Sequence, residues 1–184
     1  MRGLKGWLIG GAVVGALVAA AAIFLASRAD TPEDIARAAM DAFRQDRFDA
    51  FRPYTPAGLS PAARLGLLCG GAPSPACRTR HEQAMARLPA EVARFEAVFA
   101  ESAARAKAAG FDWKQAVMVS VDTSGLTDHP HPGASGVETS GRIRVHGRSG
   151  AGDGFVLELT GCARMVEQGW LCAIPRWLPA SESE

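Results

Sequence analysis

Three side chains that could bind a metal ion lie close together in the stretch Asp128-His129-Pro130-His131. A carboxylate and two imidazoles are common ligands of transition metals. Metal ligands are normally held in place by the surrounding structure, however, and this stretch lies within a region from Thr123 to Gly141 that is rich in Gly, Pro, Ser and Thr and predicts a loop. Asp128, His129 and His131 are therefore the metal-site candidates, but we expect no bound metal or other cofactor.

Four cysteines could form two disulfide bonds, Cys69–Cys77 and Cys162–Cys172. An even number of cysteines in an exported chain predicts a disulfide framework. The alternative is that Cys69 and Cys77 bind a metal together with His81, but no second histidine lies at zinc-finger spacing. The sequence therefore favours two disulfides.

Common enzyme motifs are absent from the sequence. There is no G-x-S-x-G motif, and the glycine-rich run Gly147 to Gly154 lacks the Gly-Lys-Ser/Thr end of a phosphate-binding loop. This run lies between two predicted strands, so we expect a hairpin connection. We predict no catalytic or cofactor-binding residue, and we expect a binding protein in preference to an enzyme.

The stretch from Trp7 to Leu25 contains nineteen residues and no charged side chain. A helix of that length is about 28 Å long, close to the ~30 Å thickness of the hydrocarbon core of a bilayer. Arg2 and Lys5 precede the stretch and acidic residues follow it, which predicts a cytoplasmic N-terminus. We therefore expect a single-pass protein of the bacterial inner membrane whose C-terminal domain lies in the periplasm.

Two further features of this stretch leave alternatives open. Ser27-Arg28-Ala29 has small residues at the positions that a signal peptidase recognises, but the apolar run is longer than the ~7 to 15 residues of a secretory signal, which favours an uncleaved anchor. Gly11 and Gly15 form a G-x-x-x-G step, which is either a packing face for a second membrane helix or a result of Ala- and Gly-rich composition. A membrane-protein partner, or self-association, is therefore an expectation.

The part of the chain that follows Ala29 is nearly neutral. All nineteen acidic residues lie beyond Ala29, whereas three of the twenty basic residues (Arg2, Lys5 and Arg28) precede Asp30, so this part carries 17 minus 19, or −2. Nucleic-acid-binding domains normally carry a basic patch. We find none in the sequence and expect no nucleic-acid partner.

Helical patterns come first along the chain. Thr31-Pro32-Glu33-Asp34 has a hydroxyl at the N-cap position, proline at the first helical position and acidic residues in the first turn, which predicts a helix to about Gln45. Its apolar stripe is formed by Ile35, Ala38, Ala39, Ala42 and Phe43. A shorter helix is predicted from Ser60-Pro61 to Leu68, followed by an irregular loop over Ala72 to Ala76.

A long amphipathic helix is predicted from about Arg78 to Ala109. Pro89 is expected to kink this helix or to begin a second one. Gly110 predicts its C-terminal end.

Alternating patterns follow and predict four antiparallel strands. Val117, Val119 and Val121 are expected on one face of a strand from about Gln115 to Asp122. The next two strands are marked by Ile143 and Val145, and by Phe155, Leu157 and Leu159.

The last predicted hairpin turns at Glu167-Gln168-Gly169. A symmetrical register places Cys162 opposite Cys172, Leu157 opposite Trp177 and Glu158 opposite Arg176. Pro175 lacks a donor for the ladder, so the final strand is expected at an edge, with a bulge near Gly161 as an alternative.

Both ends of this pattern resemble a known family. The segment from Ile35 to Phe51, with its Ala…Ala…Phe helix followed by Phe48-Asp49-Ala50, is similar to the first helices of NTF2-like (cystatin-like α+β roll) domains. Leu157 to Ile174 looks like the last hairpin of the same fold. The resemblance implies an α+β roll in which helices pack on a four-stranded antiparallel meander, and it identifies no catalytic position.

The predicted organisation is a cytoplasmic N-terminus (1–6), a transmembrane helix (7–25), a linker (26–31), a periplasmic α+β domain (32–179) and a disordered tail (180–184). Our leading hypothesis is an accessory subunit or scaffold of a membrane complex. The alternative is a small-molecule-binding or catalytic NTF2-like domain with a pocket between sheet and long helix. Trp113, Trp170 and Trp177 are expected in the core, or else they line such a pocket.

The anchor hypothesis makes a direct prediction. Protein purified from its native membrane should retain residues 1–29, because its apolar stretch exceeds the length of a secretory signal. Intact-mass spectrometry measures this, and a mature N-terminus at Asp30 would contradict the anchor.

Overall fold

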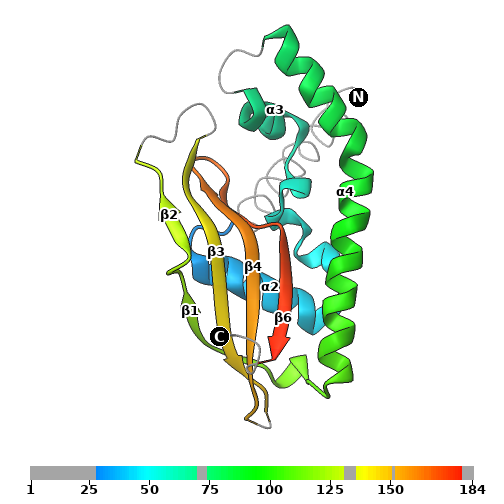
Figure 1. Cartoon of the computed structure of the whole chain (residues 1–184), viewed down its shortest axis with the longest axis vertical. Helices are drawn as coiled ribbons and strands as arrows, with labels where there is room; N and C mark the ends of the chain where they lie inside the picture. Colours follow the sequence, from blue (N-terminus) through cyan, green and yellow to red (C-terminus); the bar gives the residue numbers. More distant parts are fainter. Residues whose placement is uncertain (1–27, 70–73, 131–135, 151, 180–184) are drawn as a thin grey trace, which may run out of the picture.

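The computed structural model describes residues 28–69, 74–130, 136–150 and 152–179. This part of the chain is an α+β fold with a curled antiparallel sheet (Figure 1). Its helices are α2 (Pro32–Gln45), α3 (Pro61–Cys69) and α4 (Pro75–Ala108), with short 3₁₀ turns η1 (Phe48–Ala50), η2 (Arg52–Tyr54), η3 (Pro56–Gly58) and η4 (Trp113–Gln115). Its strands are β1 (Val117–Asp122), β2 (Leu126–Asp128), β3 (Val137–Arg148), β4 (Gly154–Met165), β5 (Gly169–Leu171) and β6 (Ile174–Pro179).

Residues 1–6, the predicted span 7–25 with Gly11 and Gly15, and the tail 180–184 lie outside the described residues. Within the described ranges, no helix combines the length and the apolar character that a membrane crossing requires.

Helix α2 begins and ends where the sequence predicts. The Thr31 hydroxyl accepts a hydrogen bond from the Asp34 backbone N–H, and the Asp34 carboxylate accepts one from the Thr31 N–H, which forms a reciprocal capping box. Pro32 occupies the first turn, and Asp46 ends the helix in a left-handed conformation. The predicted stripe faces the sheet, with Ile35, Ala39, Ala42 and Phe43 buried.

Helix α4 starts earlier than expected and is continuous. Ser74 is its N-cap, and Pro75 takes the first helical position, where the missing N–H of proline removes no intrahelical hydrogen bond. Residues 75 and 76 are therefore helical, and the predicted loop over residues 72–76 is too long by two residues. Pro89 lies inside one unbroken helix, so the second-helix alternative is wrong. At the other end, Gly110 takes a left-handed conformation while Gly110 and Phe111 donate to Lys107 and Ala106, a Schellman cap that confirms the predicted end.

In the described part of the chain the sheet has six strands, not the four predicted. The order is β1-β3-β4-β5, with β2 also paired to β3 and β6 also paired to β4. The predicted loop from 123 to 141 contains β2 and the start of β3, because the 12-residue β3 extends past β1 and its first half pairs with β2. The predicted last strand is interrupted after Leu171, so it forms β5 and β6.

The register of the β4–β6 pair is confirmed. Leu157 lies opposite Trp177, Glu158 opposite Arg176, and Cys162 is bonded to Cys172. Pro175 lies in β6, which pairs only with β4 in the described part of the sheet. The bulge at Gly161, which has a φ of 58°, interrupts the pairing of β4 with β3 and leaves the pairing with β6 in register.

A second bulge, in β1, overturns the predicted strand face. The register with β3 shifts between Met118 and Ser120, so Val119 is the extra residue. Met118 and Val121 pack against the core, whereas Val117 and Val119 are 58% and 56% exposed. Strict alternation along β1 is therefore wrong, because a bulge moves every later side chain to the other face.

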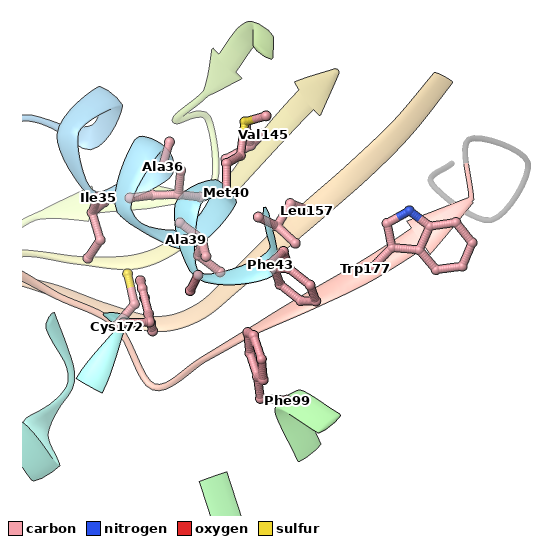
Figure 2. Close-up of a cluster of buried hydrophobic side chains, with 14 of the residues drawn as sticks. Ile35, Ala36, Ala39, Met40, Phe43, Phe99, Val145, Leu157, Cys172 and Trp177 are labelled. Atoms are coloured by element: carbon pink, nitrogen blue, oxygen red, sulfur yellow. The ribbon is translucent and has the colours of Figure 1, made fainter. Parts of the chain in front are cut away.

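The core lies between α2, the inner face of the sheet and the C-terminal half of α4 (Figure 2). The Phe43 ring packs 4.6 Å from Phe99 of α4 and 4.5 Å from Trp113. Buried Ser102 of α4 accepts a hydrogen bond from the Trp177 backbone N–H of β6 at 2.6 Å. Phe43 of α2 thus packs against Phe99 of α4, while α4 also contacts β6 directly through Ser102.

Replacing Phe43 by alanine should lower the free energy of unfolding by about 3–5 kcal/mol, because a buried ring in contact with two other rings leaves a cavity. Urea unfolding followed by circular dichroism measures the change. The exposed Leu68→Ala is the matched control and should change stability by less than about 0.5 kcal/mol. Equal losses in both variants would contradict this description of the core.

The capping box predicts a pH-dependent contribution to stability. The hydrogen bond with the Thr31 side chain is the main cause that lowers the pKa of Asp34 below its ordinary 3.8. A lowered folded-state pKa stabilises the fold above the ordinary value, and this contribution is lost as the pH falls through the lowered pKa. Thr31→Ala should cost about 1 kcal/mol at neutral pH, and unfolding titrations should show that this cost decreases as the pH falls through the lowered pKa of Asp34. A cost that does not change with pH across the acid unfolding titration would contradict the coupling.

Candidate functional site

The face of the sheet that points away from α2 is not covered by any helix of the described chain (Figure 1). Ile143 and Val145 of β3 point into the core. The residues that alternate with them, Arg142, Arg144 and His146, therefore point outward. This outer surface of β1, β3, β4 and β6 is called the open face below.

A row of four charged residues crosses the open face. Asp122 of β1 lies opposite Arg144 of β3, which lies opposite Glu158 of β4, which lies opposite Arg176 of β6. The Glu158 carboxylate accepts hydrogen bonds from Arg144 Nε at 3.4 Å and from Arg142 Nη1 at 3.3 Å. The charges therefore alternate in sign along the row.

The electrostatics of Asp122 agree with this arrangement. Its pKa is held below the ordinary value first by the hydrogen bond from the Ser124 backbone N–H, and then by the Ser124 side chain and the positive potentials of His146 and Arg144. Asp122 is thus a carboxylate at neutral pH.

Positive charge exceeds negative charge on the open face. It carries four arginines (Arg142, Arg144, Arg148 and Arg176) and two carboxylates (Asp122 and Glu158), a balance of 4 minus 2, or +2. Residues 30–184 as a whole carry −2. The described side chains of Arg148 and Arg176 are exposed and form none of the ion pairs found in the described ranges. The fold thus creates a basic surface that the linear sequence does not show.

An apolar border adjoins this basic surface. The exposed Val117 lies opposite Arg148 in the pairing of β1 with β3, and the exposed Val119 forms the bulge beside it. A bulge on an edge strand opposes the addition of a further strand, so the side chains of β1, and not its backbone, are available for contact. Arginines next to exposed apolar side chains are typical of protein–protein interfaces.

Two of the three metal-site candidates, Asp128 and His129, form hydrogen bonds with side chains of β3. Asp128 accepts a hydrogen bond from the Thr139 hydroxyl at 2.9 Å, and the His129 Nε2 lies 2.8 Å from the Ser140 hydroxyl. His131 lies outside the described residues, and within them no three metal-binding side chains form a group. These two hydrogen bonds help to hold β2 against β3.

Both predicted disulfides are present. Cys69 at the end of α3 is bonded to Cys77 in the first turn of α4, and Cys162 of β4 is bonded to Cys172 beyond β5. No cysteine is free. Two bridges are consistent with a chain that folds in an oxidising compartment.

The three tryptophans expected in the core are buried there, as Trp113, Trp170 and Trp177 each belong to the main cluster. Each of these three residues also lines a hollow at the surface. The three tryptophans thus pack in the core and also line hollows at the surface.

Arg28 and Ala29, which precede α2, are hydrogen-bonded to the β4–β5 hairpin. Ala29 is buried, its carbonyl accepts a hydrogen bond from the Trp170 N–H at 2.7 Å, and Arg28 donates to the Glu167 carbonyl in the turn between β4 and β5. These described residues of the predicted linker 26–31 are therefore packed against the domain.

Sequence reasoning missed the charged row because its two halves lie in different strand pairs. The Glu158–Arg176 pair follows from the last hairpin, but the Asp122–Arg144 pair depends on the bulge at Val119. Without that bulge, Arg144 would lie opposite Val121. The one part of the row that the sequence predicted is the Glu158–Arg176 pair.

Comparisons of the chain with protein-family models, curated proteins and solved structures find no match.

Proposed function

We propose that this protein is an accessory subunit or scaffold of a bacterial inner-membrane complex. In this proposal residues 7–25 span the membrane, the domain lies in the periplasm with an NTF2-like roll, and the open face of the sheet binds an acidic surface of a partner protein. The open face with its balance of +2 and its apolar border is the observation that carries the proposal.

Charge and composition favour a protein as partner. Asp122 and Glu158 lie among the arginines, so a uniform row of phosphates would meet repulsion at two positions. A partner surface with carboxylates opposite Arg148 and Arg176 and apolar groups opposite Val117 would be complementary. Arg148 and Arg176 are exposed and form none of the ion pairs found in the described ranges, so their charges are available for recognition.

The entry of the chain supports an orientation of the domain relative to the membrane. Only three residue steps separate Leu25, the end of the predicted span, from Arg28, which corresponds to at most about 11 Å of extended chain. Arg28 contacts the β4–β5 turn, and the neighbouring Val166 is exposed. In the proposed arrangement this turn therefore faces the membrane.

The catalytic alternative has less support. In the described ranges the buried polar and charged residues are Thr55, Arg64, Ser102 and Ser149. None of these is an Asp, His or Tyr that would serve as a general acid or base in a buried pocket.

The double variant Arg148→Glu/Arg176→Glu tests the proposal. It changes the charge of the open face by −4, from +2 to −2, and should reduce the partner recovered by mild-detergent purification from the native membrane by at least about tenfold, since a loss of 1.4 kcal/mol has that effect. Quantitative mass spectrometry of the co-purifying proteins measures the recovery.

The matched control is Arg87→Glu/Arg94→Glu, which makes the same charge change on the exposed surface of α4. The control should retain the partner. An equal loss in both variants, or full recovery with the open-face variant, would contradict the proposed docking surface.

A further inference from the structure

Helices α3 and α4 form a hairpin whose two helices are joined at two places. The Cys69–Cys77 disulfide joins the end of α3 to the first turn of α4, and the His81 Nε2 lies 3.1 Å from the Pro61 carbonyl oxygen. Residues 61–69 and 75–81, which contain both connections, are called the hairpin tip below. The tip is thus a connected unit on which exposed side chains can be presented together.

The hairpin tip lies at the end of the domain where the chain enters. Ser102, in the C-terminal half of α4, accepts a hydrogen bond from the Trp177 N–H near the end of β6. Ahead of α3, the Tyr54 carbonyl accepts one from the Cys172 N–H, just beyond β5. The tip therefore lies on the side of the β4–β5 turn, which Arg28 contacts. Figure 1 shows α3 and the start of α4 at the opposite end of the domain from the β3–β4 connection.

Exposed apolar side chains occur at this end. Leu68 of the hairpin tip is 45% exposed, and Val166 of the β4–β5 turn is 55% exposed. In the described ranges the other large apolar side chains that are exposed are Val117 and Val119 of β1. Large exposed apolar side chains are therefore found in two places, the border of the open face and the end where the chain enters.

The hairpin tip is also part of a basic stretch of sequence. No acidic residue lies between Asp49 and Glu82, and four arginines do, so this stretch carries +4, whereas residues 30–184 as a whole carry −2. One of the four, Arg64, is buried and donates to a backbone carbonyl. The other three are exposed and form none of the ion pairs found in the described ranges: Arg52, Arg78 and Arg80.

The length of chain ahead of the domain indicates what covers this end. In the proposed function residues 7–25 span the membrane, and at most about 11 Å of extended chain separates Leu25 from Arg28. The end of the domain that carries Arg28 must therefore stay close to the lipid headgroups. Anionic phospholipids attract clusters of basic side chains, and an exposed leucine can enter the boundary between headgroups and acyl chains.

We propose that the hairpin tip binds the periplasmic surface of the bilayer through the headgroups of anionic phospholipids. Arg78 and Arg80 contact the lipid phosphates, and Leu68 enters the boundary between headgroups and acyl chains. This inference rests on the membrane anchor of the proposed function. It adds a second contact, separate from the open face, that sets the orientation of the domain on the membrane.

Photo-crosslinking in vesicles tests the inference. Full-length protein with a photo-crosslinking amino acid at position 68 is reconstituted into vesicles of phosphatidylcholine and phosphatidylglycerol, and into vesicles of phosphatidylcholine alone. Mass spectrometry after illumination measures the lipid adduct. Position 68 should form an adduct with phosphatidylglycerol. Position 153, which is exposed in the β3–β4 connection at the opposite end of the domain, should form none.

The double variant Arg78→Glu/Arg80→Glu changes the charge of the hairpin tip by −4. It should lower the adduct from position 68 at least about tenfold, because basic side chains near an anionic bilayer are replaced by acidic ones. The matched control, Arg87→Glu/Arg94→Glu, makes the same change farther along α4 and should retain the adduct. Vesicles without phosphatidylglycerol need no substitution and should lower the adduct to a similar extent.

Three results would overturn the inference. They are no adduct from position 68, equal adducts from positions 68 and 153, and an adduct that is lowered neither by Arg78→Glu/Arg80→Glu nor by the removal of phosphatidylglycerol.

Intact-mass spectrometry of the reconstituted protein separates this inference from the proposed function. Loss of residues 1–29 would contradict both, whereas a protein that retains them and forms no adduct from position 68 would contradict this inference alone. The open-face variant Arg148→Glu/Arg176→Glu should leave the lipid adduct unchanged.

Discussion

The register of β4 against β6 is the constraint on which the rest of the domain depends. It directs Leu157 and Trp177 into the core and Glu158 and Arg176 onto the open face. Because successive strand residues point to opposite sides, a shift of β6 by one residue would bury Arg176 and expose Trp177, while the pairing of β4 with β3 would keep Leu157 and Glu158 in place. The Cys162–Cys172 bridge and the hydrogen bond from the Trp177 N–H to Ser102 oppose such a shift. One pairing thus determines the core, the charged row and the position of the Trp177 indole.

Features that depend on local sequence could be predicted, and features that depend on pairing between distant segments could not. The limits of α2 follow from Thr31, Pro32 and a helical stripe, and the last hairpin follows from its cysteines and its turn. The bulge at Val119 leaves no mark on β1, since it is defined by the residues of β3 that oppose it. Strand β2 was missed for the same reason, because its three residues are ordered by pairing with β3.

The candidate sites follow the same division. Cysteine pairing was predictable from count and spacing, whereas the hydrogen bonds that Asp128 and His129 form with β3 side chains depend on the pairing of β2 with β3. The basic character of the open face could not be obtained from the net charge of −2 that residues 30–184 carry, because it arises from the distribution of arginines on one side of a sheet. The place of the hairpin tip at the end where the chain enters requires Tyr54 of η2 to meet Cys172 beyond β5, which no local pattern specifies.

The central claim is that the open face contacts a partner protein in the cell. A photo-crosslinking amino acid placed at position 148 tests this most directly, with one at position 87 on α4 as the comparison. The account predicts that light produces a defined crosslinked product from position 148 and none from position 87. The same products from both positions, or none from position 148, would contradict it.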